Sequence, residues 1–181
     1  REQLQLARVL WALAGNPPHK RGSNITPVHH RLAMLQLAIE SNPGFEISLV
    51  DVQRPGPHYS VDMLGLLLKD NPSAEFVFLM GSDSLRDILT WHQPARLVAL
   101  ATLGVMPRPG VTPDMDGLEA ALPGLHERVR FIDSPLIEIS ASDIEARVAS
   151  GCSIRYLLPP AVEEYIYVHN LYRSSNMKLN D

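Results

Sequence analysis

Three adjacent side chains with N–H donors are the first candidates for chemistry in this sequence. His19, Lys20 and Arg21 lie in the stretch AGNPPHKRG, where two prolines stiffen the loop and the side chains could hold a phosphate. A solvated basic turn accounts equally well for three such residues in a row. The stretch therefore indicates either a phosphate clamp or a plain basic turn, and the residues alone leave both interpretations open.

A second candidate is Gly81-Ser82-Asp83, which directly follows the apolar run FVFLM at 76–80. A glycine at this place lets a ligand approach the backbone, and the Asp83 carboxylate can accept hydrogen bonds from ribose hydroxyls. Asp83 can also simply cap the helix that follows. From these residues alone, the helix cap is the interpretation that we favour.

Aromatic and hydroxyl side chains supply two further candidates. Tyr59 and Trp91 lie in loops that follow predicted strands and could stack on a planar ring, although large aromatic residues are more often part of a core. Ser140 and Ser142 lie at the start of a predicted helix, where we interpret them as donors to an anion. We do not interpret them as nucleophiles, because the G-x-S-x-G motif is absent. The glycine-rich P-loop and dinucleotide-binding patterns are absent as well.

The loops that carry these residues follow short strands that alternate with helices. Strands are predicted at 9–11, 45–49, 76–80, 103–106 and 129–132. Parallel neighbours need crossover connections, and the helices between most of these strands can supply them. We therefore predict an α/β fold with a doubly wound parallel sheet, in which ligands bind beyond the carboxyl ends of the strands. Residues 1–7 are predicted to be the last turns of an amphipathic helix.

Composition and charge exclude several classes of protein. The 181 residues are 45% hydrophobic and 20% charged, which suits one globular domain at 1–173 with a frayed tail at 174–181. A net charge of −4 without long runs of either sign predicts no nucleic-acid or membrane partner. His29 and His30 point about 100° apart on a helix, so no metal site is predicted. The single Cys152 indicates a reducing, cytoplasmic setting.

Taken in order, these stretches resemble the bacterial nicotinate mononucleotide adenylyltransferases, a family of the Rossmann-like nucleotidyltransferase superfamily. The matching segments run through nearly the whole chain: AGNPPHK at 14–20, HRLAMLQLAI at 30–39, RPGPHYSVDML at 54–64, FLMGSDSL at 78–85, Trp91, PRPG at 107–110, ISASDI at 139–144 and SIRYLLPPAVEEYI at 153–166. Each motif is short, but the joint occurrence of Pro-Pro-His-Lys, Gly-x-Asp and Ile-Ser-x-Ser at these spacings is specific.

The resemblance implies a reaction and its substrates. AMP would pass from ATP to nicotinate mononucleotide, forming deamido-NAD and pyrophosphate in NAD biosynthesis. Mg²⁺ would accompany ATP, and the phosphate of the mononucleotide would attack the α-phosphorus without a covalent enzyme intermediate. The partners would then be small molecules, while a homo-oligomer and the preference for the acid over the amide mononucleotide stay open.

The resemblance also implies roles for residues in four places. His19 and Lys20 match the family's phosphate-contacting loop, and Ser140 and Ser142 match the helix start that binds the triphosphate. Tyr59, Ser60 and Trp91 match the pocket for the nicotinate ring, and Gly81 and Asp83 match contacts to adenosine.

The sequence departs from the family pattern in two places. The family's Gly-Gly-x-Phe-Asp-Pro-x-His-x-Gly-His segment would lie upstream of Arg1, so we expect this chain to lack the first strand and the catalytic histidines and to be inactive by itself. Glu145 stands where the family usually has an arginine, and Arg147 lies about 200° further round the helix. Two alternatives remain: another small adenylyltransferase, such as the pantetheine-phosphate type, or a non-catalytic nucleotide-binding relative.

Overall fold

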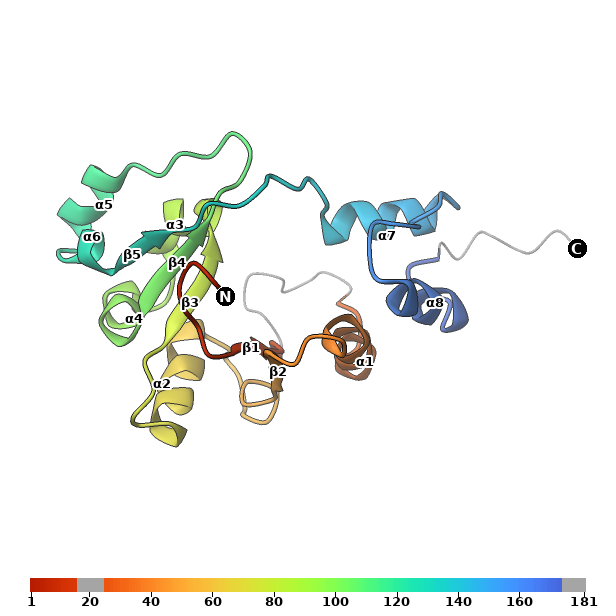
Figure 1. The fold of residues 1–181 in the computed structure, drawn as a ribbon, viewed down its shortest axis with the longest axis horizontal. Helices are drawn as coiled ribbons and strands as arrows, with labels where there is room; N and C mark the ends of the chain where they lie inside the picture. Colours follow the sequence, from red (N-terminus) through yellow and green to blue (C-terminus); the bar gives the residue numbers. More distant parts are fainter. Residues whose placement is uncertain (16–24, 174–181) are drawn as a thin grey trace, which may run out of the picture. The chain divides into compact units, whose positions relative to one another are not determined.

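The computed structural model describes residues 1–15 and 25–173, and the chain divides into two compact units (Figure 1). Unit 1 comprises Arg1–Ile25 and Ser48–Leu136, and unit 2 comprises Thr26–Ile47 and Ile137–Asp181. The predicted phosphate loop at His19 and Lys20 and the predicted tail at 174–181 lie outside the described residues.

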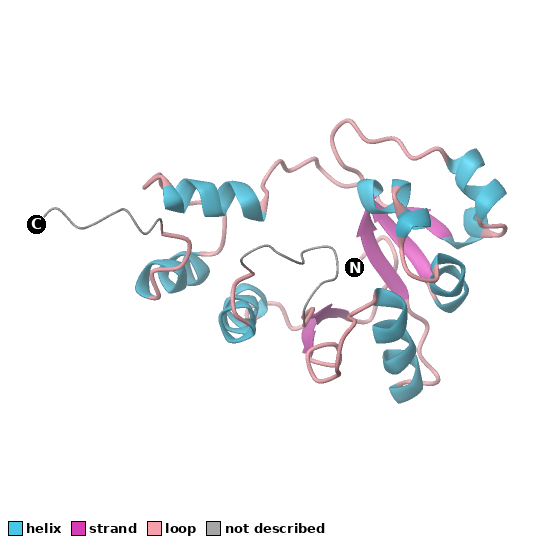
Figure 2. Cartoon of the chain, turned by 180° about the vertical axis from the view of Figure 1, so that it is seen from behind, coloured by secondary structure: helices cyan, strands magenta, loops and turns pink. Residues whose placement is uncertain are grey.

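Unit 1 is organised around a three-stranded parallel sheet with the order β3-β4-β5, coloured as strands in Figure 2. The strands are β3 (Val77–Gly81), β4 (Thr102–Met106) and β5 (Val129–Phe131). Val77 pairs with Thr102, and Leu103 pairs with Val129. Helices make each crossover that a parallel pair requires. They are α3 (Ser82–Arg86), the 3-10 turn η2 (Ile88–Thr90) and α4 (Pro94–Leu100) before β4, and α5 (Met115–Ala121) and α6 (Leu125–Arg128) before β5.

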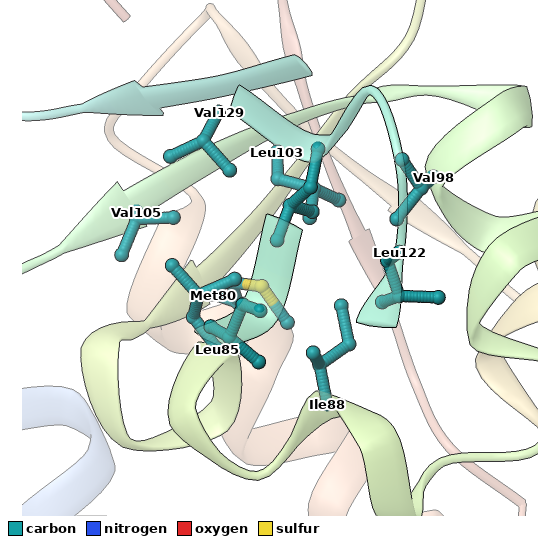
Figure 3. Packing of buried hydrophobic residues seen from close by; sticks show 10 residues of the cluster. Met80, Leu85, Ile88, Val98, Leu103, Val105, Leu122 and Val129 are labelled. Atoms are coloured by element: carbon teal, nitrogen blue, oxygen red, sulfur yellow. The ribbon is translucent and has the colours of Figure 1, made fainter. Parts of the chain in front are cut away.

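The core of unit 1 lies where side chains of this sheet meet the crossover helices (Figure 3). Successive strand residues face opposite sides of a sheet, so Leu103 and Val105 pack into one cluster while Gly104 between them faces away. That cluster contains Met80, Leu85, Ile88, Val98, Leu103, Val105, Leu118, Leu122, Leu125 and Val129. A second cluster joins α2 (Ser60–Asp70) to α4 through Val61, Leu64, Leu97 and Ala101.

Two further strands, β1 (Val9–Ala12) and β2 (Phe45–Ser48), lie close to their predicted positions. The Leu13 amide just after β1 donates to the Ser48 carbonyl at 3.1 Å. Residues 1–7, however, form turns rather than the predicted helix. Gln5 has a φ of 51°, in the left-handed region, which interrupts a right-handed helix. The Gln3 side chain also accepts from the Asp133 amide at 2.9 Å, so a distant partner organises this segment.

The described residues of unit 2 form three helices, α1 (Val28–Ile39), α7 (Ala141–Ala149) and α8 (Pro160–Val168). Its buried core consists of Val148, Ile154, Val162 and Ile166. α1 packs against α8, as the apolar spacing of both helices predicts. None of the described helices is long and apolar enough to cross a membrane.

A cluster of rings lies where α1 meets α8 in unit 2. The His30 Nδ1 atom lies 3.0 Å from the Tyr165 hydroxyl, and the His30 ring is 4.1 Å from that of His29 and 5.3 Å from that of His169. Partial burial lowers the pKa of His30, and the positive charge that His29 and His169 can carry lowers it further. The cluster therefore favours the neutral imidazole at this position.

Candidate functional site

Unit 1 contains a cavity of about 1070 Å³. Its wall is made by the segment Leu4–Ala14, the first part of α2, the strand β3 and the residues between α3 and α4. Four of the predicted site residues line it: Tyr59, Ser60, Asp83 and Trp91. These residues are up to 32 positions apart in the sequence, and the fold brings them into the wall of one cavity. That volume is slightly above the range of about 300–1,000 Å³ that is typical of small-molecule sites.

Tyr59 and Trp91 are held in the cavity wall by other rings. Tyr59 is the residue that precedes α2, and its ring stacks on that of His92 with 4.0 Å between centroids and 21° between planes. Trp91 packs edge-to-face against Phe78 of β3, with centroids 6.0 Å apart. Both rings therefore line the cavity and also pack against the core. For Trp91 this agrees with the other interpretation given above, in which a large aromatic residue belongs to the core.

His92 was not among the predicted site residues, although its ring lies in the same cavity wall. Its position directly after Trp91 was the available signal in the sequence. Its Nε2 atom lies 3.0 Å from the Gln93 side-chain nitrogen, and the His92 side chain is exposed. Stacking on Tyr59 gives it a defined orientation at the mouth of the site.

Gly81 and Asp83 lie at the carboxyl end of β3, where the doubly wound fold predicts ligand contacts. Gly81 is the residue before α3 and Asp83 lies in the first turn of that helix, so Asp83 is not its N-cap residue and the helix-cap interpretation is wrong. A side chain at position 81 would overlap the Asp83 carboxylate and meet Arg108 Nε at 3.1 Å. The glycine is therefore required for the close approach of these two groups to the strand end.

The Asp83 carboxylate has an acceptor to spare. Its Oδ1 atom is buried and makes no hydrogen bond within residues 1–15 and 25–173, and Arg108 Nε lies 3.8 Å from it. Arg108 lies just after β4, and its amide donates to the buried Ser82 hydroxyl at 2.9 Å. A buried acceptor without a partner suits a hydroxyl donor from a ligand. Arg108 was not among the predicted site residues. Its position in the loop after a strand parallel to β3 was the signal that could have identified it.

Ser140 and Ser142 lie in unit 2, at the start of α7. Ser140 is the N-cap residue: its Oγ accepts from the Asp143 amide at 3.0 Å and donates to the Asp143 carboxylate at 2.7 Å. Ser142 is exposed in the first turn. The predicted helix start is confirmed, and its anion-binding role stays a prediction, because Asp143 already occupies the Ser140 hydroxyl.

Glu145, which stands where the family usually has an arginine, is exposed on α7. Arg147 on the same helix could replace that cation only if its side chain pointed toward the helix start. Arg147 Nε donates to the Ser153 carbonyl at 2.9 Å, beyond the other end of the helix. Arg147 is therefore engaged away from the helix start, as its angular position on the helix predicts.

Within residues 1–15 and 25–173, no group of three His, Cys, Asp or Glu side chains is arranged to hold a metal ion. Mg²⁺ commonly binds through one or two carboxylates and the phosphates of a substrate. Such an ion would arrive with its substrate and would need few protein ligands.

Comparison with known proteins relates the whole chain to one family. A model of the family described as cytidylyltransferase-like matches residues 1–147. A protein of Thermomicrobium roseum, described as "Probable nicotinate-nucleotide adenylyltransferase", is 56% identical over 96% of this chain and 81% of its own length. A Roseiflexus protein with the same description is 42% identical over 96% of this chain and 86% of its own length.

Among solved structures, the Plasmodium falciparum nicotinic acid mononucleotide adenylyltransferase complexed with NaAD aligns with a TM-score of 0.73. The alignment covers 92% of this chain and 83% of that one at 20% identity, which supports the fold. The same enzyme complexed with APC aligns with a TM-score of 0.71. The chain therefore belongs to the cytidylyltransferase-like family and, within it, to the nicotinate-nucleotide adenylyltransferases.

Proposed function

We propose that the protein transfers AMP from ATP to nicotinate mononucleotide, forming deamido-NAD and pyrophosphate. The observation that carries the proposal is the cavity of unit 1, whose wall contains the residues assigned to the nicotinate ring and to adenosine, Tyr59, Ser60, Asp83 and Trp91. Relatives that are 56% and 42% identical and carry the name of this activity support it. The carboxyl edge of a parallel sheet is also where this fold class binds nucleotides.

The proposed roles follow from the chemistry of each group. The rings of Tyr59 and Trp91 border the nicotinate ring, and the Ser60 hydroxyl and the first amides of α2 face its polar end. The free Asp83 oxygen accepts from a ribose hydroxyl, while Gly81 lets that carboxylate lie close against the end of β3. The ring end of the site is thus built to position a substrate rather than to attack it.

The reaction needs positioning and charge neutralisation. The mononucleotide phosphate is itself the nucleophile, so no side chain has to form a covalent bond to AMP. We assign His19 and Lys20 to the phosphates and Ser140 and Ser142 to the triphosphate, as the family resemblance implies. Mg²⁺ bound to ATP would neutralise charge on the leaving pyrophosphate. Cations and N–H donors aimed at the phosphates stabilise the transition state.

We propose that both units work as a single catalytic domain over residues 1–173. The matches to relatives run through 96% of the chain and so include both units. The small-molecule substrates require no macromolecular partner, and the exposed free thiol of Cys152 suits a reducing, cytoplasmic setting.

A further strand is part of the proposal, because the cavity is larger and more apolar than a ring pocket requires. Its wall includes Val9 and Leu10 of β1 and Phe78 and Leu79 of β3. In the part of the chain that the structure describes, β3 pairs with β4 on one side only. We propose that an additional parallel strand fills this space in the active enzyme and carries the family's catalytic histidines.

The experiment uses the 181-residue chain and a version extended at its N-terminus by the family segment. Each is incubated with ATP and either nicotinate mononucleotide or phosphopantetheine, and pyrophosphate and the adenylylated product are quantified. Deamido-NAD formation by the extended version supports the proposal. Preference for phosphopantetheine favours the other adenylyltransferase, and nucleotide binding without any turnover favours the non-catalytic relative.

A further inference from the structure

Helix α2 begins at the cavity without the usual side-chain cap. Its N-cap position is occupied by Tyr59, whose side chain makes no capping hydrogen bond. Serine, threonine, asparagine and aspartate are preferred there, because their oxygens accept from the first amides of a helix, which have no partner inside it. Tyr59 and Ser60 both line the cavity. The start of α2 therefore needs support from another part of the chain.

Arg54 holds the backbone from which α2 begins. Its Nη1 atom donates to the Pro57 carbonyl at 2.8 Å, and its Nη2 atom donates to the Tyr59 carbonyl at 3.2 Å. The Tyr59 carbonyl also accepts from the amides of Asp62 and Met63, each at 3.2 Å, and so closes the first turn of the helix. Arg54 thus binds the same oxygen on which that first turn depends.

A buried carboxylate fixes the guanidinium group of Arg54. Asp51 is 3% exposed, and Arg54 Nε donates to its Oδ1 atom at 2.9 Å. The Gly15 amide donates to the Oδ2 atom at 3.0 Å, and His58 Nδ1 lies 3.2 Å from the same oxygen. Separating the two charges would leave each of them buried without its partner, which is costly. The guanidinium group is therefore a rigid support.

Neutralising Asp51 does not by itself explain the contacts of Arg54. The compact ammonium group of a lysine would supply the same charge. Arg54 instead spreads its donors over the Asp51 carboxylate and two carbonyls, which a planar fork can reach at the same time. These contacts indicate a role at the helix start in addition to the ion pair.

We infer that Arg54 is a positioning residue that holds the start of α2 in place for the polar end of the substrate ring. The inference rests on the proposed function and deepens it. The Ser60 hydroxyl and the first amides of α2 are donors, so they suit a ring carboxylate, which only accepts hydrogen bonds, better than a ring amide. Arg54 is outside the cavity wall and acts through the helix start.

The test compares Arg54→Lys with Arg96→Lys in the 181-residue chain. Lysine keeps a positive charge beside Asp51, but it lacks the fork that reaches both carbonyls. Arg96 makes the matched control, because this arginine of α4 lies 3.7 Å from Asp62 of α2 and is outside the cavity wall. The measurements are hydrogen exchange of the Asp62 and Met63 amides by NMR, and the affinities for nicotinate mononucleotide, nicotinamide mononucleotide and ATP by calorimetry.

In Arg54→Lys, we expect exchange at Asp62 and Met63 to accelerate about tenfold and nicotinate mononucleotide to bind about tenfold more weakly, as loss of a charged hydrogen bond predicts. The affinities for nicotinamide mononucleotide and ATP should stay within about twofold, and Arg96→Lys should change none of these values. The Asn71 amide, which closes the other end of α2 on the Leu67 carbonyl, should keep its exchange rate. Unchanged exchange at Asp62 and Met63, or an equal loss of affinity for both mononucleotides, would overturn the inference.

A second variant covers the case in which Arg54→Lys does not fold. Asp51→Asn together with Arg54→Met removes both charges, so neither is buried alone, and asparagine still offers an acceptor to the Gly15 amide. This double variant should show the same faster exchange and the same loss of preference for the acid. Wild-type exchange, or an unchanged preference, would count against the inference.

The two proposals fail in different ways. If neither the 181-residue chain nor its extended version binds nicotinate mononucleotide, the proposed function fails. Exchange at Asp62 and Met63 needs no ligand, so it still decides whether Arg54 holds the start of α2.

Discussion

The two regions that the proposed reaction assigns to the ring and to the triphosphate are built in different ways. The ring region in unit 1 depends on contacts between distant residues, such as Gly15 with Asp51 and Tyr59 with His92, 36 and 33 positions apart. The start of α7 in unit 2 depends on Ser140 and Asp143, which are three positions apart.

This difference predicts how each region responds to damage. Removing an N-cap hydroxyl costs about 1 kcal/mol and leaves the rest of a helix in place. Removing one partner of a buried charge network costs about 3–5 kcal/mol, because the remaining charge stays buried without compensation. The ring region should therefore be lost as a whole, whereas the helix start should weaken gradually.

The largest effect should come from filling the apolar space beside β3. We expect faster adenylyl transfer and higher thermal stability after N-terminal extension with the family segment than in the 181-residue chain. The added strand would satisfy the free backbone groups of β3 and bury the apolar wall. Pyrophosphate release and thermal unfolding measure the two effects.

Hydrogen exchange of the backbone amides shows whether the effect of the added strand is confined to unit 1. The added strand should protect the amides of β3, while those of α7 should exchange as before. Comparable turnover with and without the extension would mean that the catalytic groups lie within residues 1–181.

The next effect concerns Lys20 in the extended enzyme. Lys20→Ala should lower kcat by about 10²-fold, because a cation aimed at a reacting phosphate acts mainly in the transition state. The melting temperature should barely change, because Lys20 is assigned to the substrate phosphates and not to the packing of the chain. Steady-state kinetics and calorimetric unfolding check this pair of results, and unchanged kinetics with a lowered melting temperature would contradict it.

A smaller gain should follow from Glu145→Arg on α7. The substitution replaces an exposed anion with a cation near the helix start assigned to the triphosphate. We expect ATP binding to strengthen by about 1–3 kcal/mol, the range of a charge-assisted hydrogen bond, with no change for nicotinate mononucleotide. Calorimetry in the extended enzyme measures both affinities, and equal or weaker ATP binding would refute the assignment of α7.

The smallest effect should be a pH dependence that separates unit 2 from unit 1. The pKa of His30 is lowered in the folded chain, first by partial burial and then by His29 and His169. Its contribution to stability is therefore complete above the unfolded pKa, near 6.5, and is lost as pH falls through the lowered folded value.

Thermal unfolding at pH 7.5 and pH 5.5 tests this contribution of His30. His30→Gln should reduce the loss of stability on acidification, because glutamine does not titrate. The matched control is His126→Gln in unit 1, where the histidine is exposed beside Glu119 and outside the ring cluster. An equal pH response of wild type and His30→Gln would show that this histidine does not contribute.

The strands were predictable because their signals are local. All five predicted strands lie within one or two residues of the observed ones, since short apolar runs bounded by turns need no knowledge of their partners. The short helices α5 and α6 were missed, because their helical character depends on packing Leu118 and Leu125 into the unit 1 core. The helix predicted at 1–7 was wrong, because its apolar spacing does not reveal the turn at Gln5.

By itself the sequence determined the alternation of strands and helices, the helix start at Ser140 and the order of the family motifs, because each depends on residues a few positions apart. Only the tertiary structure decided that Asp83 leaves a buried oxygen free, that His92 stacks on Tyr59 and that Asp51 holds both Gly15 and Arg54. These features depend on burial and on distances between residues far apart in the chain, and the packing of the whole unit sets both.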